Sequence, residues 1–351
     1  MKTKICVFCG KKPHNKNKEH IIPQWLMKLT DTYQKEMSVG SNWSTGHEQV
    51  FNFSNFTFPS CTDCNTSYGI KEARIKPIIE KVLKDYHVSK KEIIELLDWF
   101  DKIRIGLHLA VMYMNKQTFN FDPKYCIESR VGLKDRLLAI TNTYDNSKTL
   151  RWTGVNSYLF MFSPTTFTLK INNVLFTNCS SDFIVSKQLG FPFLEFFRPK
   201  IEDSNEVDIF IKKGKHKITN PLFKSKLYEP SIIISQPIYS VGKSKLKEYY
   251  DNEYVRNNSI SYEKGIGEIF ITEHGETSTL NDNESISSIS DTPNKKKKFK
   301  FNKPTTLFQF EVFNFIPYNL SNLSEEQKRV HNQFRRFMIE NAKLQLKKYD
   351  Y

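Results

Sequence analysis

Four of the six cysteines form two C-x-x-C pairs, Cys6 with Cys9 and Cys61 with Cys64. Each pair has the spacing of a zinc knuckle, a tight turn that points two thiolates at one tetrahedral ion. The sequence therefore predicts a structural Zn²⁺ site with four thiolate ligands. A redox dithiol is the alternative, but a redox motif of this kind would not need a second copy.

A carboxylate and an imidazole stand side by side between the two pairs, as Glu19 and His20, and Asn65 directly follows the last paired cysteine. Four thiolates close the coordination of a zinc ion, so any chemistry must come from other groups. If the zinc draws the segments together, Glu19 and Asn65 offer two oxygen ligands to a hard cation such as Mg²⁺ or Mn²⁺. His20 is then placed to take a proton from an attacking water. In the alternative, Glu19 only favours a helix N-terminus and His20 packs on Trp25.

The order of these pieces, C-x-x-C, then E-H-I-I-P, then C-x-x-C-N, resembles the HNH endonuclease family in its four-cysteine zinc form. It is also similar to zinc-bearing phage endonucleases that resolve branched DNA. The resemblance covers about residues 1 to 75. It implies a treble-clef-like ββα-metal unit that hydrolyses phosphodiester bonds, with Glu19 and Asn65 binding the catalytic cation and His20 as the general base.

Two features depart from the family pattern. The family often has Asp at the position of Glu19, whose longer side chain can still reach the ion. The closest match to the family's middle asparagine is Asn55, which lies one residue further from Cys61 than in the usual pattern. We therefore assign no catalytic role to Asn55.

The chain is strongly basic, with 52 Lys and Arg against 38 Asp and Glu and a formal net charge of +14. This charge favours a polyanionic partner, and the resemblance favours DNA, with RNA as the alternative. The first 18 residues carry six lysines and no acidic residue. Among them we expect phosphate contacts from Lys11, Lys12, Lys16 and Lys18, although such a run can equally be a solvated surface.

No apolar run approaches the roughly 20 residues that a membrane-spanning helix needs, and the N-terminus has no apolar signal segment. We therefore expect a cytoplasmic protein that does not bind membranes. The lone thiols of Cys126 and Cys179 are expected to be buried and inert.

The hydrophobic periodicity changes along the chain and predicts an α+β fold, in which a small zinc-stapled unit precedes a larger body with a helical first part and a β-rich second part. The predicted parts are an HNH unit at 1–88, an α+β recognition or scaffold domain at 89–274, a flexible Ser- and Asp-rich, then Lys-rich linker at 275–303, and a C-terminal strand and helix at 304–351.

Several elements of the body have local signatures. Ser89 and Glu92 have the spacing of a capping box that opens a long buried helix, on which His108 is expected to be a satisfied core residue. Pro77 is expected to kink or restart the preceding helix. Hairpins are predicted in FTLKINNVLFTN and VDIFIKKGKHKITN, and strands in PSIIISQPIY, GEIFITEHG and TTLFQFEVFNF.

A closing helix is predicted from Ser324 to about Lys348. Its apolar stripe is expected to pack against the body and consists of Val330, Phe334, Phe337 and Leu344.

These observations lead us to expect a metal-dependent HNH endonuclease acting on DNA. Chains with such a unit before a larger domain resemble components of bacterial restriction or antiphage defence. One alternative is a non-catalytic zinc module that binds nucleic acid through its lysines, with Glu19, His20 and Asn65 inert. A second is a nuclease that a sensing or partner-binding C-terminal body holds inactive. The C-terminal body is also a candidate surface for a protein partner or for homo-oligomerisation.

Overall fold

The structure is a computed structural model that describes residues 5–42, 44–115, 125–143, 147–200, 206–219, 232–239, 252–261, 265–287 and 301–349. Helices and strands are both abundant in this part of the chain, which confirms the predicted α+β class. Most of the predicted basic run, Lys295 to Lys298 and Lys300, lies outside the described residues. Among the described helices, none combines the length and the apolar character needed to cross a membrane.

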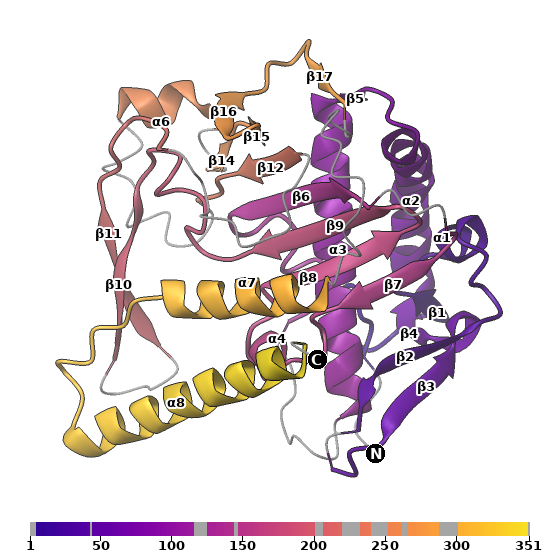
Figure 1. Ribbon diagram of the computed structural model, residues 1–351, viewed down its shortest axis with the longest axis horizontal. Helices are drawn as coiled ribbons and strands as arrows, with labels where there is room; N and C mark the ends of the chain where they lie inside the picture. The colour runs from indigo at the N-terminus through magenta and orange to yellow at the C-terminus, as the bar shows by residue number, and fades with distance from the viewer. Residues whose placement is uncertain are drawn as a thin grey trace.

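A seven-stranded antiparallel sheet forms the middle of the molecule, in the order β16-β15-β12-β6-β9-β8-β7 (Figure 1). The hairpin between β8 and β9 turns over Asn172 and Asn173, as the sequence predicts, and Asn172 has the positive φ of 52° that this tight turn uses. The strands are β6 Arg136–Asn142, β7 Leu150–Thr153, β8 Thr166–Ile171, β9 Val174–Ser180, β12 Ile232–Gln236, β15 Phe270–Glu273 and β16 Glu276–Thr279.

The central strands are buried on both faces, so the sheet has a helical layer on each side. Leu138 and Ile140 of β6 belong to the core on the side of the long helix α3, Lys90–Met114. The alternating neighbours Leu137 and Ala139 belong to the core on the side of α7, Asn302–Phe315. The helix α3 begins with the predicted capping box between Ser89 and Glu92.

The N-terminal part contains two antiparallel strands followed directly by a helix. Strand β1, Lys16–His20, pairs with β4, Thr57–Cys61, so that Lys16 lies opposite Cys61 and His20 opposite Thr57. Helix α2, Thr62–Leu83, follows and runs through Pro77 without the predicted restart. Between β1 and β4 lie α1 Gln24–Leu29, β2 Glu36–Ser41, β3 Glu48–Asn52 and the short 3-10 turn η1 Phe53–Asn55.

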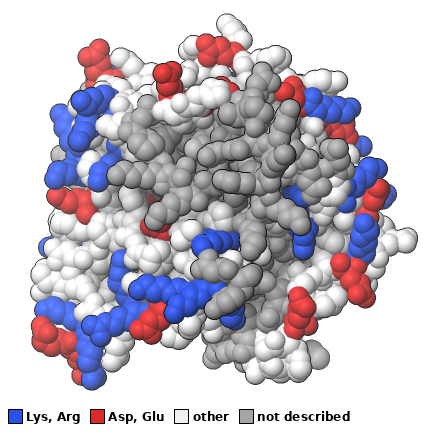
Figure 2. Space-filling view, viewed as in Figure 1, with Lys and Arg blue, Asp and Glu red and all other residues white. Residues whose placement is uncertain are grey.

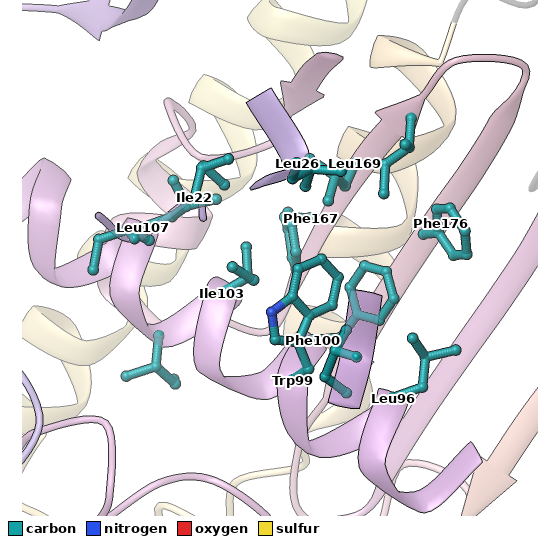
Figure 3. Packing of buried hydrophobic residues seen from close by; sticks show 14 of the residues in the cluster. Ile22, Leu26, Leu96, Trp99, Phe100, Ile103, Leu107, Phe167, Leu169 and Phe176 are labelled. Carbon is teal, nitrogen blue, oxygen red and sulfur yellow. The ribbon is translucent and has the colours of Figure 1, made fainter. Parts of the chain in front are cut away.

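This N-terminal unit shares one hydrophobic core with the body. Ile22 and Leu26 pack with Trp99, Ile103 and Leu107 of α3, which in turn contact the sheet through Phe100 with Phe167 and Phe176 (Figure 3). The contact is close, because a Cβ atom added at Gly106 of α3 would lie 2.8 Å from a methyl carbon of Ile21. Residues on both sides of the predicted boundary after residue 88 therefore belong to one hydrophobic core.

Two predictions for the C-terminal third are wrong. Residues 275–287, predicted to be linker, contain β16 at the edge of the sheet and β17, Ser285–Ile286, which pairs with β5, Val88–Ser89. The residues of β16, ETST, alternate between exposed and half-buried and carry no apolar side chain, so the strand gives no hydrophobic signal in the sequence. The segment TTLFQFEVFNF is not a strand but most of α7, whose buried residues Thr305, Phe308 and Val312 follow helical spacing.

The closing helix is confirmed as α8, Glu325–Lys348, with a capping box at Ser324. Its predicted packing stripe is confirmed in part. The rings of Phe334 and Phe337 meet those of Phe162 and Tyr158 at centroid distances of 4.9 Å and 5.5 Å, whereas Val330 and Leu344 remain 56% and 58% exposed. The helix also buries Met338 and Ala342 against Leu159 of α4, Tyr158–Phe162.

The second predicted hairpin is also wrong. Strand β11, Val207–Lys212, pairs with the preceding β10, Phe193–Pro199, and the chain beyond Lys212 returns to hydrogen-bond Gly190 through His216. The remaining elements are α4 Tyr158–Phe162, α6 Glu253–Asn257, β13 Ser259–Ser261 and β14 Ile266–Gly267.

Candidate metal centre and active site

The two C-x-x-C pairs come together as the sequence predicts. All four sulfur atoms lie within 4.8 Å of one another, and the Sγ atoms of Cys9 and Cys61 are 3.9 Å apart. A tetrahedral zinc ion with Zn–S bonds of about 2.3 Å needs sulfur separations of about 3.8 Å. The cluster therefore has the donor set and the spacing that a zinc ion requires.

The backbone around the first pair builds the knuckle. The N–H of Gly10 donates to the carbonyl of Cys6 at 2.9 Å, and Gly10 has a φ of +72°, which favours glycine. The N–H of Val7 donates to the carbonyl of Pro59 in β4 at 2.9 Å, which ties the knuckle to the strand that carries Cys61. The sulfurs of both pairs thus meet at the junction of β4 and α2.

The electrostatics of the cluster favour a bound cation. Burial opposes the charge of Cys6, but backbone N–H groups, including those of Cys9 and Cys61, donate to its sulfur and lower its pKa. Burial and then the charge on Cys6 raise the pKa of Cys64. Four neighbouring thiolates repel one another, and a divalent cation at their centre removes that repulsion.

His20 is held in one orientation by the loop between the strands. Its Nε2 atom lies 3.0 Å from the backbone carbonyl of Ser54, in η1. A carbonyl only accepts hydrogen bonds, so Nε2 must carry the proton and Nδ1 of the neutral ring must carry the lone pair. The side-chain amide of Gln24 reaches Nδ1 at 3.4 Å, which is long for a hydrogen bond. The imidazole therefore presents a weakly engaged basic nitrogen.

Strand alternation puts His20 on the same face of β1 as two of the predicted phosphate contacts. Lys16, Lys18 and His20 are at every second position, and both lysines are exposed. Lys11 and Lys12, in the knuckle turn, are exposed as well. The half-buried imidazole of His20 therefore lies on the same face of β1 as the ammonium groups of Lys16 and Lys18.

Glu19 points the other way and is buried, at 6% exposure. Its Oε1 accepts from the ammonium of Lys102 in α3 at 2.7 Å, and the same ammonium binds Glu72 of α2 at 2.8 Å and the carbonyl of Ile21 at 3.1 Å. We call Glu19, Lys102 and Glu72 the buried triad. Burial opposes the charge of Lys102, but Glu72 and Glu19 outweigh it and raise its pKa. Burial raises the pKa of Glu72 more than Lys102 lowers it.

Asn65 lies in the first turns of α2, directly after Cys64, and is half-buried. Glu72 follows it by seven residues on the same helix face, about 10 Å further along the axis. None of the hydrogen bonds and ion pairs of the described residues joins Asn65 to Glu19 or His20. The structure thus brings Glu19 to Glu72, and it separates Glu19 from His20 by the two faces of β1.

Sequence reasoning missed Lys102 and the carbonyl of Ser54. Lys102 stands 83 residues from Glu19, inside a helix whose buried run extends from Trp99 to Met112 with one half-buried position. The signal that could have found it is a cluster of charged residues, Asp101, Lys102 and Arg104, in the middle of a helix whose other buried residues are mostly apolar. A backbone acceptor such as Ser54 leaves no signal in residue types.

Another feature that the sequence did not single out is the charge of α8, which carries seven Lys or Arg against three Glu. Figure 2 shows Lys and Arg side chains gathered where α8 crosses the molecule. His108, in contrast, is the satisfied core residue that was predicted. Its ring accepts from the hydroxyl of Tyr125 and donates to the carbonyl of Met161 at 2.8 Å.

No protein-family model matches the chain, and comparisons with curated proteins and with solved structures return no match.

Proposed function

We propose that the protein is a phosphodiester hydrolase of the HNH type, acting on DNA, in which His20 is the general base and the four cysteines hold a structural zinc ion. The observation that carries this proposal is the hydrogen bond from His20 Nε2 to the Ser54 carbonyl. It fixes the tautomer in which Nδ1 can take a proton, and it does so beside two exposed lysines.

The chemistry follows from this placement. Lys16 and Lys18 hold the phosphates of a strand that lies along β1, which brings the next phosphate to His20. A water beside Nδ1 attacks phosphorus, gives its proton to the imidazole, and the P–O bond to the 3′ oxygen breaks. The products are a 5′-phosphate and a 3′-hydroxyl, the latter after the leaving oxygen takes up a proton.

The hard cation that the resemblance implies does not fit the residues as they stand. Glu19 is paired with a buried ammonium and lies on the face of β1 opposite His20, and none of the hydrogen bonds of the described residues joins Asn65 to either. No step above is therefore assigned to Mg²⁺ or Mn²⁺. A cation at Glu19 would have to displace Lys102 or bind against its charge.

The test is cleavage of supercoiled and branched DNA by the purified full-length protein, in buffers containing Mg²⁺, Mn²⁺ or a chelator. His20→Ala should abolish nicking, whereas His14→Ala, which removes an exposed histidine from the preceding loop, should retain it. All three proteins should first be matched for zinc content. Equal activity of the two variants would refute the role of His20.

The buried triad favours a second candidate, a zinc-stapled module that binds nucleic acid without cutting it. In this candidate the role of Glu19 is structural, because it neutralises the buried ammonium of Lys102 in α3, and the exposed lysines only bind phosphates. A gated nuclease is a variant of the same idea, because Lys102 belongs to the body and occupies the carboxylate that a cation would use. DNA binding without cleavage under every metal condition would select the binding module.

A further inference from the structure

An open cavity of about 810 Å³ lies where the N-terminal unit meets the edge of the sheet. One wall is the β2–β3 hairpin with Phe53 of η1. A second is β7 with the residues that follow it to Ser157, and the third comes from the start of α7 and the end of α8. Its volume is within the 300 to 1,000 Å³ that is usual for small-molecule sites.

The lining is polar and mainly cationic. Lys35, Arg151 and Lys348 line it from three different elements, and in the described part of the chain none of the three has an ion-pair partner. A fourth cationic side chain of the lining, Lys148, is paired with Asp31 at 3.1 Å. Three cations brought to one cavity by separate elements repel one another, so an anion between them would be stabilised.

Aromatic rings line the same cavity. Trp152 is half-buried and is held by two rings, that of Phe56 stacked at a centroid distance of 6.3 Å and that of Phe53 edge-on at 5.7 Å. Phe301 and Tyr349 belong to the third wall and are also half-buried. A planar base has a π-face that can stack on such rings, whichever base it is.

We propose that this cavity binds a free nucleotide, with its phosphates against Lys35, Arg151 and Lys348 and its base against Trp152. Phosphate beside a base is also the chemistry of a single-stranded DNA end. The free nucleotide is favoured because Glu36 and Glu48 line the hairpin side, where carboxylates repel a continuing phosphate backbone but accept hydrogen bonds from ribose hydroxyls or base amino groups.

The site is separate from the chemistry assigned to His20, so its test does not depend on nuclease activity. Calorimetric titration of the full-length protein with ATP, AMP and ribose 5-phosphate measures the contributions of phosphate and base directly. ATP should bind more tightly than AMP, and AMP at least tenfold more tightly than ribose 5-phosphate, which lacks the base.

The variant Arg151→Gln/Lys348→Gln should weaken ATP binding at least tenfold. Its matched control is Lys343→Gln/Lys347→Gln, which removes the same charge from α8 at exposed positions outside the cavity and should change ATP affinity less than threefold. Both variants alter exposed side chains, so folding is checked by circular dichroism and is expected to be unchanged.

Three results would overturn the proposal. They are the absence of ATP and AMP binding to the wild-type protein, equal losses in the variant and in its control, and tighter binding of a short single-stranded oligonucleotide than of ATP with the same dependence on Arg151 and Lys348. The last result would assign the cavity to a nucleic-acid strand.

Discussion

Replacing Lys102 by methionine tests the buried triad, on which the choice between the candidate functions depends. The ammonium makes three hydrogen bonds, to Glu19 at 2.7 Å, to Glu72 at 2.8 Å and to the carbonyl of Ile21 at 3.1 Å, and its side chain is 2% exposed. Methionine preserves most of the length of the side chain and removes the charge. Glu19 and Glu72 then remain buried without a counter-ion.

Removing one partner of a buried ion pair costs about 3 to 5 kcal/mol of unfolding free energy, because the remaining charge stays buried and unpaired. We expect a loss of this size for Lys102→Met at neutral pH, measured by urea unfolding. The matched control is Lys90→Met. Lys90 is buried as well and bridges two carboxylates, but these are more open to solvent, with Glu268 19% and Asp282 90% exposed. Water can hydrate the carboxylates that remain, so removal of the Lys90 ammonium should cost less than removal of the Lys102 ammonium.

The second half of the prediction concerns cations. Two carboxylates freed of their ammonium offer oxygen ligands to Mn²⁺, and a ligand at 100 times its dissociation constant stabilises the folded state by about 2.7 kcal/mol. Millimolar Mn²⁺ should therefore restore much of the stability of Lys102→Met and change the wild-type protein and Lys90→Met little. Neutralising all three groups, as in Glu19→Gln/Glu72→Gln/Lys102→Met, should remove the response to Mn²⁺.

The reasoning is refuted if the unfolding free energy of Lys102→Met lies within about 1 kcal/mol of that of the wild-type protein. It is also refuted if Mn²⁺ stabilises all of the proteins equally. The first result would mean that the triad is not a buried charge cluster, and the second that the ammonium does not occupy a potential cation position.

Three other predictions follow from the structure. Cys64→Ser should lower the zinc content, measured by mass spectrometry, from one ion per chain to none, whereas Cys126→Ser should keep it; retained zinc in the first variant would exclude the four-thiolate site. Burial lowers the pKa of His108 to about 4 from its ordinary 6.5, so the unfolded state takes up a proton more readily than the folded state. The unfolding free energy should therefore fall by up to about 3 kcal/mol as pH falls from 6.5 towards 4, and this loss should be absent from His108→Gln. Lys16→Gln/Lys18→Gln should reduce the slope of log affinity for duplex DNA against log salt by about 1.8, and an unchanged slope would remove both lysines from the interface.

Local signatures in the sequence predict the local parts of this fold well. The spacing of the cysteines predicts the cluster, because a knuckle is built within a few residues and needs only one partner knuckle. The Ser89 and Glu92 capping box and the turn at Asn172 are likewise decided by neighbours in the chain. In each case the residues that make the contact lie close together in the sequence or repeat a known spacing.

Contacts between distant segments explain what the sequence could not predict. The sequence of α7 has the alternation of a strand, because Phe308 and Phe310 are separated by polar residues. In the structure Gln309 is nevertheless buried, and its side-chain amide donates to the carbonyls of Gly154 and Thr166. Because the buried face of α7 includes polar residues, its sequence does not show the hydrophobic periodicity of a helix. For the candidate site, residue types predict Glu19 and His20 as a pair, but strand alternation and Lys102 give them different surroundings.

The core that α3 shares with the N-terminal unit bears on how this unit can be used. A fragment ending near residue 75 would expose the side chains of Ile21, Ile22, Leu26 and Met27, all of which are fully covered in the intact chain. It would also release Glu19 from its ammonium. Zinc can hold the two knuckles of such a fragment together, but it cannot replace the apolar surface of a helix. We therefore expect the isolated segment to fold poorly when it is fused to other proteins. The shortest fragment that folds on its own should extend at least through the end of α3.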